Sequence, residues 1–511
     1  MSYSKFNKRM KFFKPFLLIG GIFISLFANS QTIRFNKYYT KGILSHGYTI
    51  ITNDSSYLIA GYQDDDVTLQ NLLLNPYVIK TDLNGDTIWS KEYGYFFWDL
   101  FQDMCKINEG NYICVGPVQD SIPINAYDYD VLCYKINSNG DTLWTKRISC
   151  LGDSAYIPWS VIETKSKNII IAGYQNSWNN ANLSGLILKL DSNGNIIWRK
   201  WFLSPYPYPN NQTYVMSYIY KILEAKNKDL IAIGKRTTAS GIEDPIVFRM
   251  DSTGKTLWLN TYGGTDNDFG TSIVPTNDGN YIASIMYKDL NSDYKISFLK
   301  IDTTGTKIWQ KNYYSIISSG NFVKAIPTFD GGYVGTGGTD ADYTSGAMDG
   351  FLIKLDANGD SLWMRFYGTL QQNDWFFDVE ATPDKGFVMT GETYSYNIGG
   401  SSVWLVKVDS LGLLIPLGIN EEPLFPTATL GNAFPNPTNS NCTISYNIPE
   451  FKNSASLFLF NMQGKQLADY PLKKGENSLQ LNLSDYAAGT YLYVLAIDNY
   501  NVKSGKVEIV K

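Results

Sequence analysis

A ten-residue phrase recurs along the chain and constrains the fold more than any other feature. Its first copy is Lys-Thr-Asp-Leu-Asn-Gly-Asp-Thr-Ile-Trp at residues 80–89. The glycine of the phrase returns at positions 85, 140, 194, 254, 305, 359 and 412, which gives a period of about 54 residues. A period of this length is typical of solenoids and propellers, in which each repeat is one supersecondary unit.

Each repeat predicts four short strands. In the second repeat these are residues 103–107, 112–116, 130–136 and 142–148, separated by turn residues. Asn139-Gly140 lies between the last two strands, and an Asn-Gly pair between alternating apolar runs is the strongest short-range signal for a hairpin. Seven four-stranded units predict an all-β fold, a seven-bladed β-propeller over residues 31–412.

The two ends of the repeat region predict how the ring closes. The seventh repeat has three strands, over residues 378–407, and stops before its Trp strand. Residues 32–39 resemble residues 87–93, with Phe35 in the place of the Trp. We therefore expect the first strand to complete the last blade, which would hide the sheet edges that an open array exposes.

The recurrent tryptophan predicts packing between blades rather than a binding site, because it returns at one structural position in every repeat. These residues are Trp89, Trp144, Trp198, Trp258, Trp309 and Trp363.

Signals for cofactor or metal chemistry are weak. The turn at residues 82–86 begins like a calcium loop, but Thr87 and Tyr93 stand where an EF-hand needs Gly and Glu, so we expect a hairpin turn. His46 is the only histidine, which excludes a His-rich metal site, and we expect it in a turn or on the surface. No phosphate loop or dinucleotide fingerprint occurs. Carboxylates are plentiful, but no pair stands out as catalytic. We expect no metal and no cofactor.

Three cysteines fall in the second repeat. Cys105 and Cys114 flank a short turn and are expected to face each other, while Cys133 aligns with an apolar core position. Two interpretations stay open: small buried thiols, or a disulfide between two of the three, which export would allow.

Loop lengths predict where a ligand binds. The turns between the first two and the last two strands of each repeat are short, whereas the other connections are long and variable. In a four-stranded blade these long connections emerge on one face, where binding residues concentrate. The aromatic candidates on that face are Trp98, Trp178, Tyr343 and Trp375.

The first 30 residues predict a secretory signal peptide. Five basic residues precede an apolar run at 16–28 that is too short to span a bilayer, and Ala28-Asn29-Ser30 provides a cleavage site. Removing five positive charges takes the formal net charge from −5 to −10. We expect no nucleic-acid partner, and no transmembrane segment in the mature chain.

The tail is a separate module. Residues 413–429 form a proline-containing linker, and alternating strands follow over residues 430–511, which predicts a small β-sandwich. The tail contains Phe-Pro-Asn-Pro at 434–437, Leu-Phe-Asn-Met-Gln-Gly-Lys at 459–465, Leu-Ser-Asp-Tyr-Ala-Ala-Gly-Thr-Tyr-Leu at 483–492 and Lys-Val-Glu-Ile-Val-Lys at 506–511.

In these motifs the tail resembles the C-terminal sorting domain of the type IX (Por) secretion system of Bacteroidetes. The motif positions are Pro435, Asn436, Pro437, Gly464, Gly489, Lys506 and Lys511. The resemblance implies recognition by the type IX secretion machinery through residues 430–511. It also implies release or attachment at the outer cell surface after loss of the signal peptide and the tail. The repeats resemble, more loosely, those of quinoprotein-type propellers.

The function predicted from the sequence is that of a secreted or surface-displayed propeller, not an enzyme, that binds a glycan or a protein. Two alternatives stay open: a secreted hydrolase or lyase that acts on polysaccharide, and a structural component of the surface.

Overall fold

The computed structural model describes eighteen segments of the chain. These are residues 33–64, 74–94, 98–119, 129–149, 154–177, 182–202, 217–238, 240–288, 294–316, 323–339, 347–369, 372–396, 400–414, 428–448, 455–461, 466–473, 475–497 and 500–511. The expected signal peptide and most of the linker lie outside these residues. No helix among the described segments is long and apolar enough to cross a membrane.

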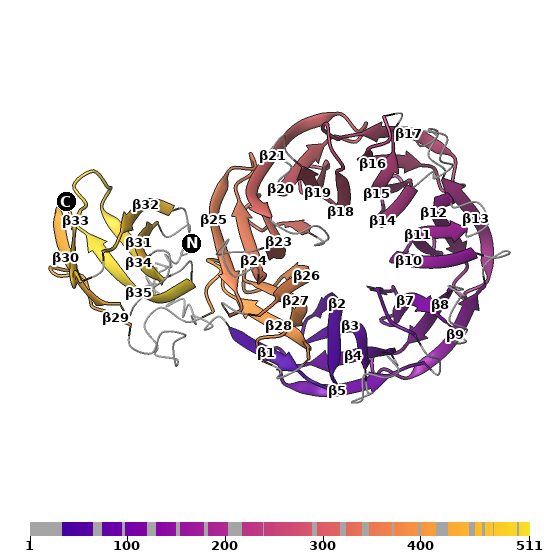
Figure 1. Cartoon of the computed structure of the whole chain (residues 1–511), viewed down its shortest axis with the longest axis horizontal. Helices are drawn as coiled ribbons and strands as arrows, with labels where there is room; N and C mark the ends of the chain where they lie inside the picture. Colours follow the sequence, from indigo (N-terminus) through magenta and orange to yellow (C-terminus); the bar gives the residue numbers. More distant parts are fainter. Residues whose placement is uncertain are drawn as a thin grey trace, which may run out of the picture. The chain divides into compact units, whose positions relative to one another are not determined.

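Four-stranded antiparallel sheets follow one another around a common axis, as expected for a β-propeller (Figure 1). The described residues form seven such sheets, here called blades 1 to 7. In six of them the strand order is the chain order, so each blade is a simple meander.

The strands of the first four blades are as follows. Blade 1 comprises β2 (Leu44–Asn53), β3 (Ser56–Asp64), β4 (Leu74–Thr81) and β5 (Thr87–Glu92); blade 2 comprises β6 (Asp103–Lys106), β7 (Tyr112–Val118), β8 (Asp130–Ile136) and β9 (Thr142–Ile148). Blade 3 comprises β10 (Ser154–Glu163), β11 (Ile169–Ser177), β12 (Asn182–Leu190) and β13 (Ile196–Phe202); blade 4 comprises β14 (Ser217–Glu224), β15 (Leu230–Thr237), β16 (Glu243–Met250) and β17 (Thr256–Thr261).

The remaining blades complete the ring. Blade 5 comprises β18 (Phe269–Pro275), β19 (Tyr281–Lys288), β20 (Tyr294–Ile301) and β21 (Lys307–Ile316); blade 6 comprises β22 (Lys324–Pro327), β23 (Tyr333–Thr339), β24 (Asp349–Leu355) and β25 (Ser361–Tyr367). Blade 7 comprises β26 (Asp374–Ala381), β27 (Phe387–Thr393), β28 (Ser402–Val408) and, from the other end of the chain, β1 (Phe35–Tyr39).

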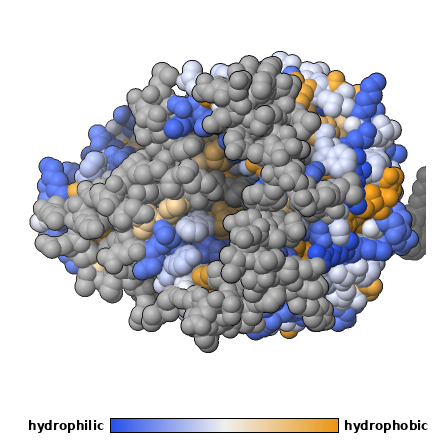
Figure 2. Space-filling view, turned by 45° about the vertical axis from the view of Figure 1, so that its right-hand side comes forward, coloured by the Kyte–Doolittle hydropathy of each residue, from blue (hydrophilic) through white to orange (hydrophobic). Residues whose placement is uncertain are grey.

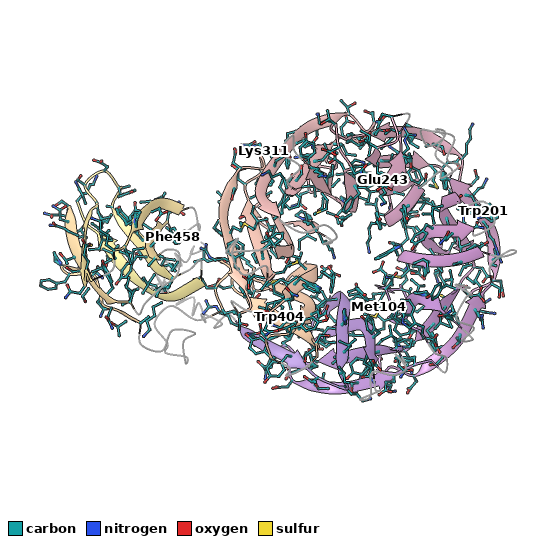
Figure 3. The ribbon with its side chains drawn as sticks, in the orientation of Figure 1. Met104, Trp201, Glu243, Lys311, Trp404 and Phe458 are labelled. Atoms are coloured by element: carbon teal, nitrogen blue, oxygen red, sulfur yellow. The ribbon has the colours of Figure 1, made fainter. Side chains whose placement is uncertain are left out.

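Strand β1 closes the ring as the sequence predicts. It pairs antiparallel with β28, with Phe35 opposite Lys407. The Arg34 guanidinium lies 2.6 Å from the Asp409 carboxylate. The indole N–H of Trp404, labelled in Figure 3, donates to the side-chain oxygen of Asn36 at 2.6 Å. Because both ends of the ring meet in one sheet, neither is left as an open edge.

The recurrent Trp and Gly positions meet between neighbouring blades. A Cβ atom added to Gly140 would lie 2.8 Å from the ring of Trp89 in the preceding blade, and one added to Gly359 would lie 2.9 Å from Trp309. The Tyr313 hydroxyl also donates to the Gly359 carbonyl at 2.5 Å. The glycine of each hairpin turn therefore has a second role, since a side chain there would displace the neighbouring ring.

Ion pairs link the same outer strands. Lys311 lies on the outer rim in Figure 3, and its ammonium is 2.5 Å from the Asp360 carboxylate of the next blade. Figure 2, in which the right-hand side of Figure 1 is turned forward, shows hydrophilic and hydrophobic residues interspersed on the described surface.

The tail forms two further sheets, as a β-sandwich should. One contains β29 (Thr429–Leu430), β30 (Asn441–Asn447) and β33 (Ser478–Asn482); the other contains β31 (Ala455–Phe460), β32 (Gln466–Pro471), β34 (Gly489–Ile497) and β35 (Tyr500–Ile509). Buried residues such as Ile444, Leu457 and Leu495 form its core.

The Pro-Asn-Pro motif of the tail is hydrogen-bonded to the last strand, β35. The Asn436 side chain donates to the Lys506 carbonyl at 2.9 Å and accepts from the Glu508 backbone N–H at 2.8 Å. These bonds join the motif to the closing residues of the chain. Gly464 lies outside the described residues, Gly489 begins β34, and Lys511 is the exposed last residue.

The expectation that Cys105 and Cys114 face each other is wrong. The register pairs Cys114 with Met104, and Cys105 with Ile113. The two thiols therefore point to opposite faces of blade 2, because side chains alternate along a strand. Cys105, Cys114 and Cys133 are free thiols, and burial raises the pKa of each of them.

Candidate ligand-binding cavity

The innermost strand of most blades carries a β-bulge at the same place. An extra residue interrupts the pairing of the first strand with the second in blades 1, 3, 4, 5 and 7. The extra residues are Tyr48, Trp159, Tyr220, Thr271 and Phe377. A bulge re-aims a side chain and is over-represented next to functional sites. The inner strands surround the centre of the ring (Figure 1), so each bulge presents a residue there.

A glycine on the second strand makes room for most of these bulges. A Cβ atom on Gly61 would lie 1.7 Å from the His46 carbonyl oxygen, and one on Gly234 would lie 1.7 Å from that of Tyr218. Gly173 and Gly391 approach a carbonyl in the same way, at 2.0 and 1.9 Å. Any side chain at these positions would push the bulged strand away, so the bulge depends on glycine.

The bulges surround a cavity at the centre of the ring. It encloses about 560 Å³ of empty space, its open mouth included. Every blade contributes lining residues, which are Tyr48, Thr49, Gln102, Asp103, Trp159, Tyr220, Lys221, Thr271, Ser272, Val323, Lys324, Phe377 and Asp378.

Aromatic rings cover two opposite parts of the wall. Trp159 and Tyr220, on blades 3 and 4, meet edge to face with centroids 5.6 Å apart. Tyr48 and Phe377, on blades 1 and 7, lie 5.1 Å apart. Burial raises the pKa of the Tyr220 phenol well above its ordinary value, so the hydroxyl keeps its proton.

Charged side chains lie between the aromatic groups. Lys221 is 2.8 Å from the Asp103 carboxylate across the ring, and Lys324 contacts Asp378 directly and Glu380 at 3.2 Å. Burial alone would lower the pKa of Lys324, but Asp378 and Glu380 outweigh it and raise the pKa above its ordinary value. Lys324 therefore stays positively charged beside the cavity.

A cluster behind Tyr48 contains the only histidine of the chain. His46 lies in β2 with its side chain 13% exposed, so the expectation of a turn or surface histidine is wrong. Its Nε2 is 2.8 Å from the buried Glu392 carboxylate, and its ring stacks on Tyr62 with centroids 4.4 Å apart. The cluster supports the ring of Tyr48, which packs against both Tyr62 and Phe377.

Of the four aromatic residues predicted from loop lengths, the two that the structure describes contact different partners. Trp98 packs on Tyr129 with centroids 5.5 Å apart, and Trp375 lies in β26 beside Phe377 at 6.4 Å. Trp178 and Tyr343 lie outside the described residues. The bulge residues were not singled out from the sequence because the side chain there varies among Tyr, Trp, Thr and Phe; the nearby signal was the recurrent glycine of the second strand.

The tail matches a known family. Residues 432–510 match the family model of the secretion system C-terminal sorting domain. This domain marks the protein for secretion and attachment to the cell surface through the type IX system, and it implies a contact with that machinery. The match covers the tail alone, and a search of curated proteins finds no match to the chain.

Solved structures resemble the chain in fold. Drosophila semaphorin 2a has a TM-score of 0.44 at 9% identity, over 93% of this chain and 98% of that one. A Hadza microbial sialidase has 0.42 at 10%, over 65% and 73%. An α-L-arabinanase of Penicillium chrysogenum has 0.40 at 10%, over 61% and 93%.

The prediction that the chain is not an enzyme is contradicted by this comparison, since two of these three proteins are enzymes by name, and we withdraw it. At these identities and TM-scores, no activity is carried over from these proteins to this chain.

Proposed function

We propose that this exported propeller acts on carbohydrate, which it holds in the central cavity. The observation that carries the proposal is the ring of bulges, which turns four aromatic residues toward one cavity together with charged and amide groups. A sugar ring has an apolar C–H face that stacks on aromatic side chains. Its edge carries hydroxyl groups that need hydrogen-bond partners, as a few well-placed polar groups in an apolar pocket provide.

Export supports the choice of ligand. The sorting domain takes the protein out of the cell, where polysaccharides and glycans are abundant. The cavity is enclosed by the inner strands of the ring, so a small ligand or the end of an oligosaccharide suits it better than a folded protein. Trp375 packs beside Phe377 and remains a predicted further contact for a longer chain.

The test is a glycan array with the secreted protein, followed by titration of each bound glycan. Trp159→Ala is expected to weaken binding by at least tenfold, because an aromatic residue that a ligand covers on binding is a typical hot spot. Trp201→Ala is the matched control, since Trp201 lies on the outer strand β13 and is 42% exposed. Incubating the bound glycan and looking for shortened products tests for cleavage in the same experiment. Glycan binding that Trp159→Ala leaves unchanged would refute the cavity as the site.

A further inference from the structure

We propose that the carbohydrate held in the cavity carries a carboxylate, as a uronic acid unit does, and that Lys221 and Lys324 bind it. This inference rests on the proposed function and adds the chemical class of the ligand. It follows from which polar groups of the wall are already occupied and which are still available.

The acceptor sites of Asp378 are filled from within the protein. One carboxylate oxygen accepts from the Thr49 hydroxyl and the Ile50 backbone N–H, both at 3.1 Å. The other accepts from the Val379 N–H at 2.7 Å and from Lys324. A carboxylate has about four acceptor sites, so none is left for a ligand hydroxyl.

Asp103 is occupied in a similar way. One of its oxygens accepts from the Val161 N–H at 2.9 Å and from Lys221 at 2.8 Å, and the other accepts from the Met104 N–H at 3.0 Å. Both carboxylates therefore accept hydrogen bonds from backbone N–H groups of the inner strands. These bonds help to hold the inner strands in register.

The lysines have donors left. An ammonium group has three N–H donors. In the described part of the chain, Lys221 gives one to Asp103, and Lys324 gives one each to Asp378 and Glu380. The two side chains are 28% and 16% exposed, and both line the cavity. Burial raises the pKa of the Glu380 carboxyl, and the nearby positive charge of Lys324 acts in the opposite direction.

The positions of the lysines fit an acidic sugar. Lys221 follows the bulge residue Tyr220 in the chain, so a cation and an aromatic face are presented side by side. A uronic acid unit matches both groups, because the same sugar ring has a C–H face for the aromatic side chain and a carboxylate for the cation. Hydrogen bonds between an ammonium and a carboxylate are stronger than those between neutral groups, which gives the preference.

The experiment compares matched glycans on the secreted protein. The panel contains oligosaccharides of galacturonate, glucuronate, mannuronate and guluronate, each with its carboxyl-reduced form, plus sulfated neutral glycans and an acidic peptide. At least one uronate is expected to bind ten times or more tightly than its reduced form. Lys221→Met and Lys324→Met are expected to remove most of that preference.

Two further variants make the result decisive. Lys311→Met is the matched control, since Lys311, like Lys324, pairs with an aspartate of the next blade, but on the outer rim. Lys324→Arg keeps the cation and should retain the preference if Lys324→Met fails to fold. Equal binding of reduced forms, equal binding of sulfated glycans or of the peptide, or a preference that survives both methionine variants would overturn the inference. If neither acidic nor neutral glycans bind in a way that depends on Trp159, the proposed function itself fails.

Discussion

The inner and outer strands of the blades differ in whether their key side chains repeat from one blade to the next. The outer strands of blades 1 to 6 repeat one pattern: a Trp covers the Gly of the next hairpin turn, and the pairing is interrupted at the residue before that Trp. The inner strands of five blades also carry a bulge, but the residue there is Tyr in two blades and Trp, Thr or Phe in the other three. The side chains that repeat are thus those that pack one blade against the next. The side chains that line the cavity vary, although they stand at a backbone position that recurs in five blades. Four predictions test this division.

The largest effect is expected at the closure of the ring. Deleting residues 33–40 removes β1, its pairing with β28 and the ion pair between Arg34 and Asp409. The open edge of β28 should lower the melting temperature by more than about 10 °C and promote aggregation. Thermal unfolding with light scattering measures both. A protein that melts unchanged would show that the outer strand of blade 7 is dispensable.

The next effect separates the two faces of one outer strand. Trp258→Ala removes a half-buried ring that packs on Gly305 and should cost about 2–3 kcal/mol of unfolding free energy. Leu257 precedes it and is 50% exposed, so Leu257→Ala should change stability by less than about 0.5 kcal/mol. Denaturant unfolding of both variants measures the difference. Equal costs would mean that the ring of Trp258 does not join blades.

Gly61→Ala tests the inner strand. The added methyl group would clash with the His46 carbonyl, so the bulge at Tyr48 must shift. We expect a loss of about 1–3 kcal/mol in stability together with weaker ligand binding, since Tyr48 lines the cavity. Binding and unfolding are measured on the same variant. Unchanged values for both would show that the bulge does not need this glycine.

The smallest effect concerns a pair of carboxyls at the junction of blades 4 and 5. Burial raises the pKa of Asp244 to about 6, with repulsion from Asp268 adding to it, and burial raises the pKa of Asp268 to about 6. Because these values exceed the unfolded value of about 3.9, the pair disfavours folding when ionised. This penalty is absent below about pH 4 and grows as the pH rises through 6.

Asp244→Asn should therefore stabilise the protein by about 1–2 kcal/mol at pH 7.5 and leave it unchanged near pH 4. Unfolding curves at the two pH values measure the effect. Asp485→Asn, on an exposed turn of the tail, is the control. Equal stabilisation at both pH values would contradict the role assigned to ionisation.

The scaffold could be predicted from the sequence and the cavity could not. The recurrent Gly and Trp, and Phe35 in the Trp position, are sufficient to predict the blades and their closure, because the same packing recurs in every repeat. The cavity is formed by residues such as Trp159 and Thr271, which share a backbone position but no chemistry. Bulges depend on contacts between strands, so sequence spacing alone does not reveal them.

The most direct test of the central claim is a crystal structure of the secreted protein with its best-binding oligosaccharide. The account predicts a sugar ring in the central cavity, stacked on Trp159 or Tyr220, with Lys221 or Lys324 within hydrogen-bonding distance of its carboxylate. A sugar bound on the outer strands, at the Gly turns or on the tail, with the cavity free of it, would contradict the account.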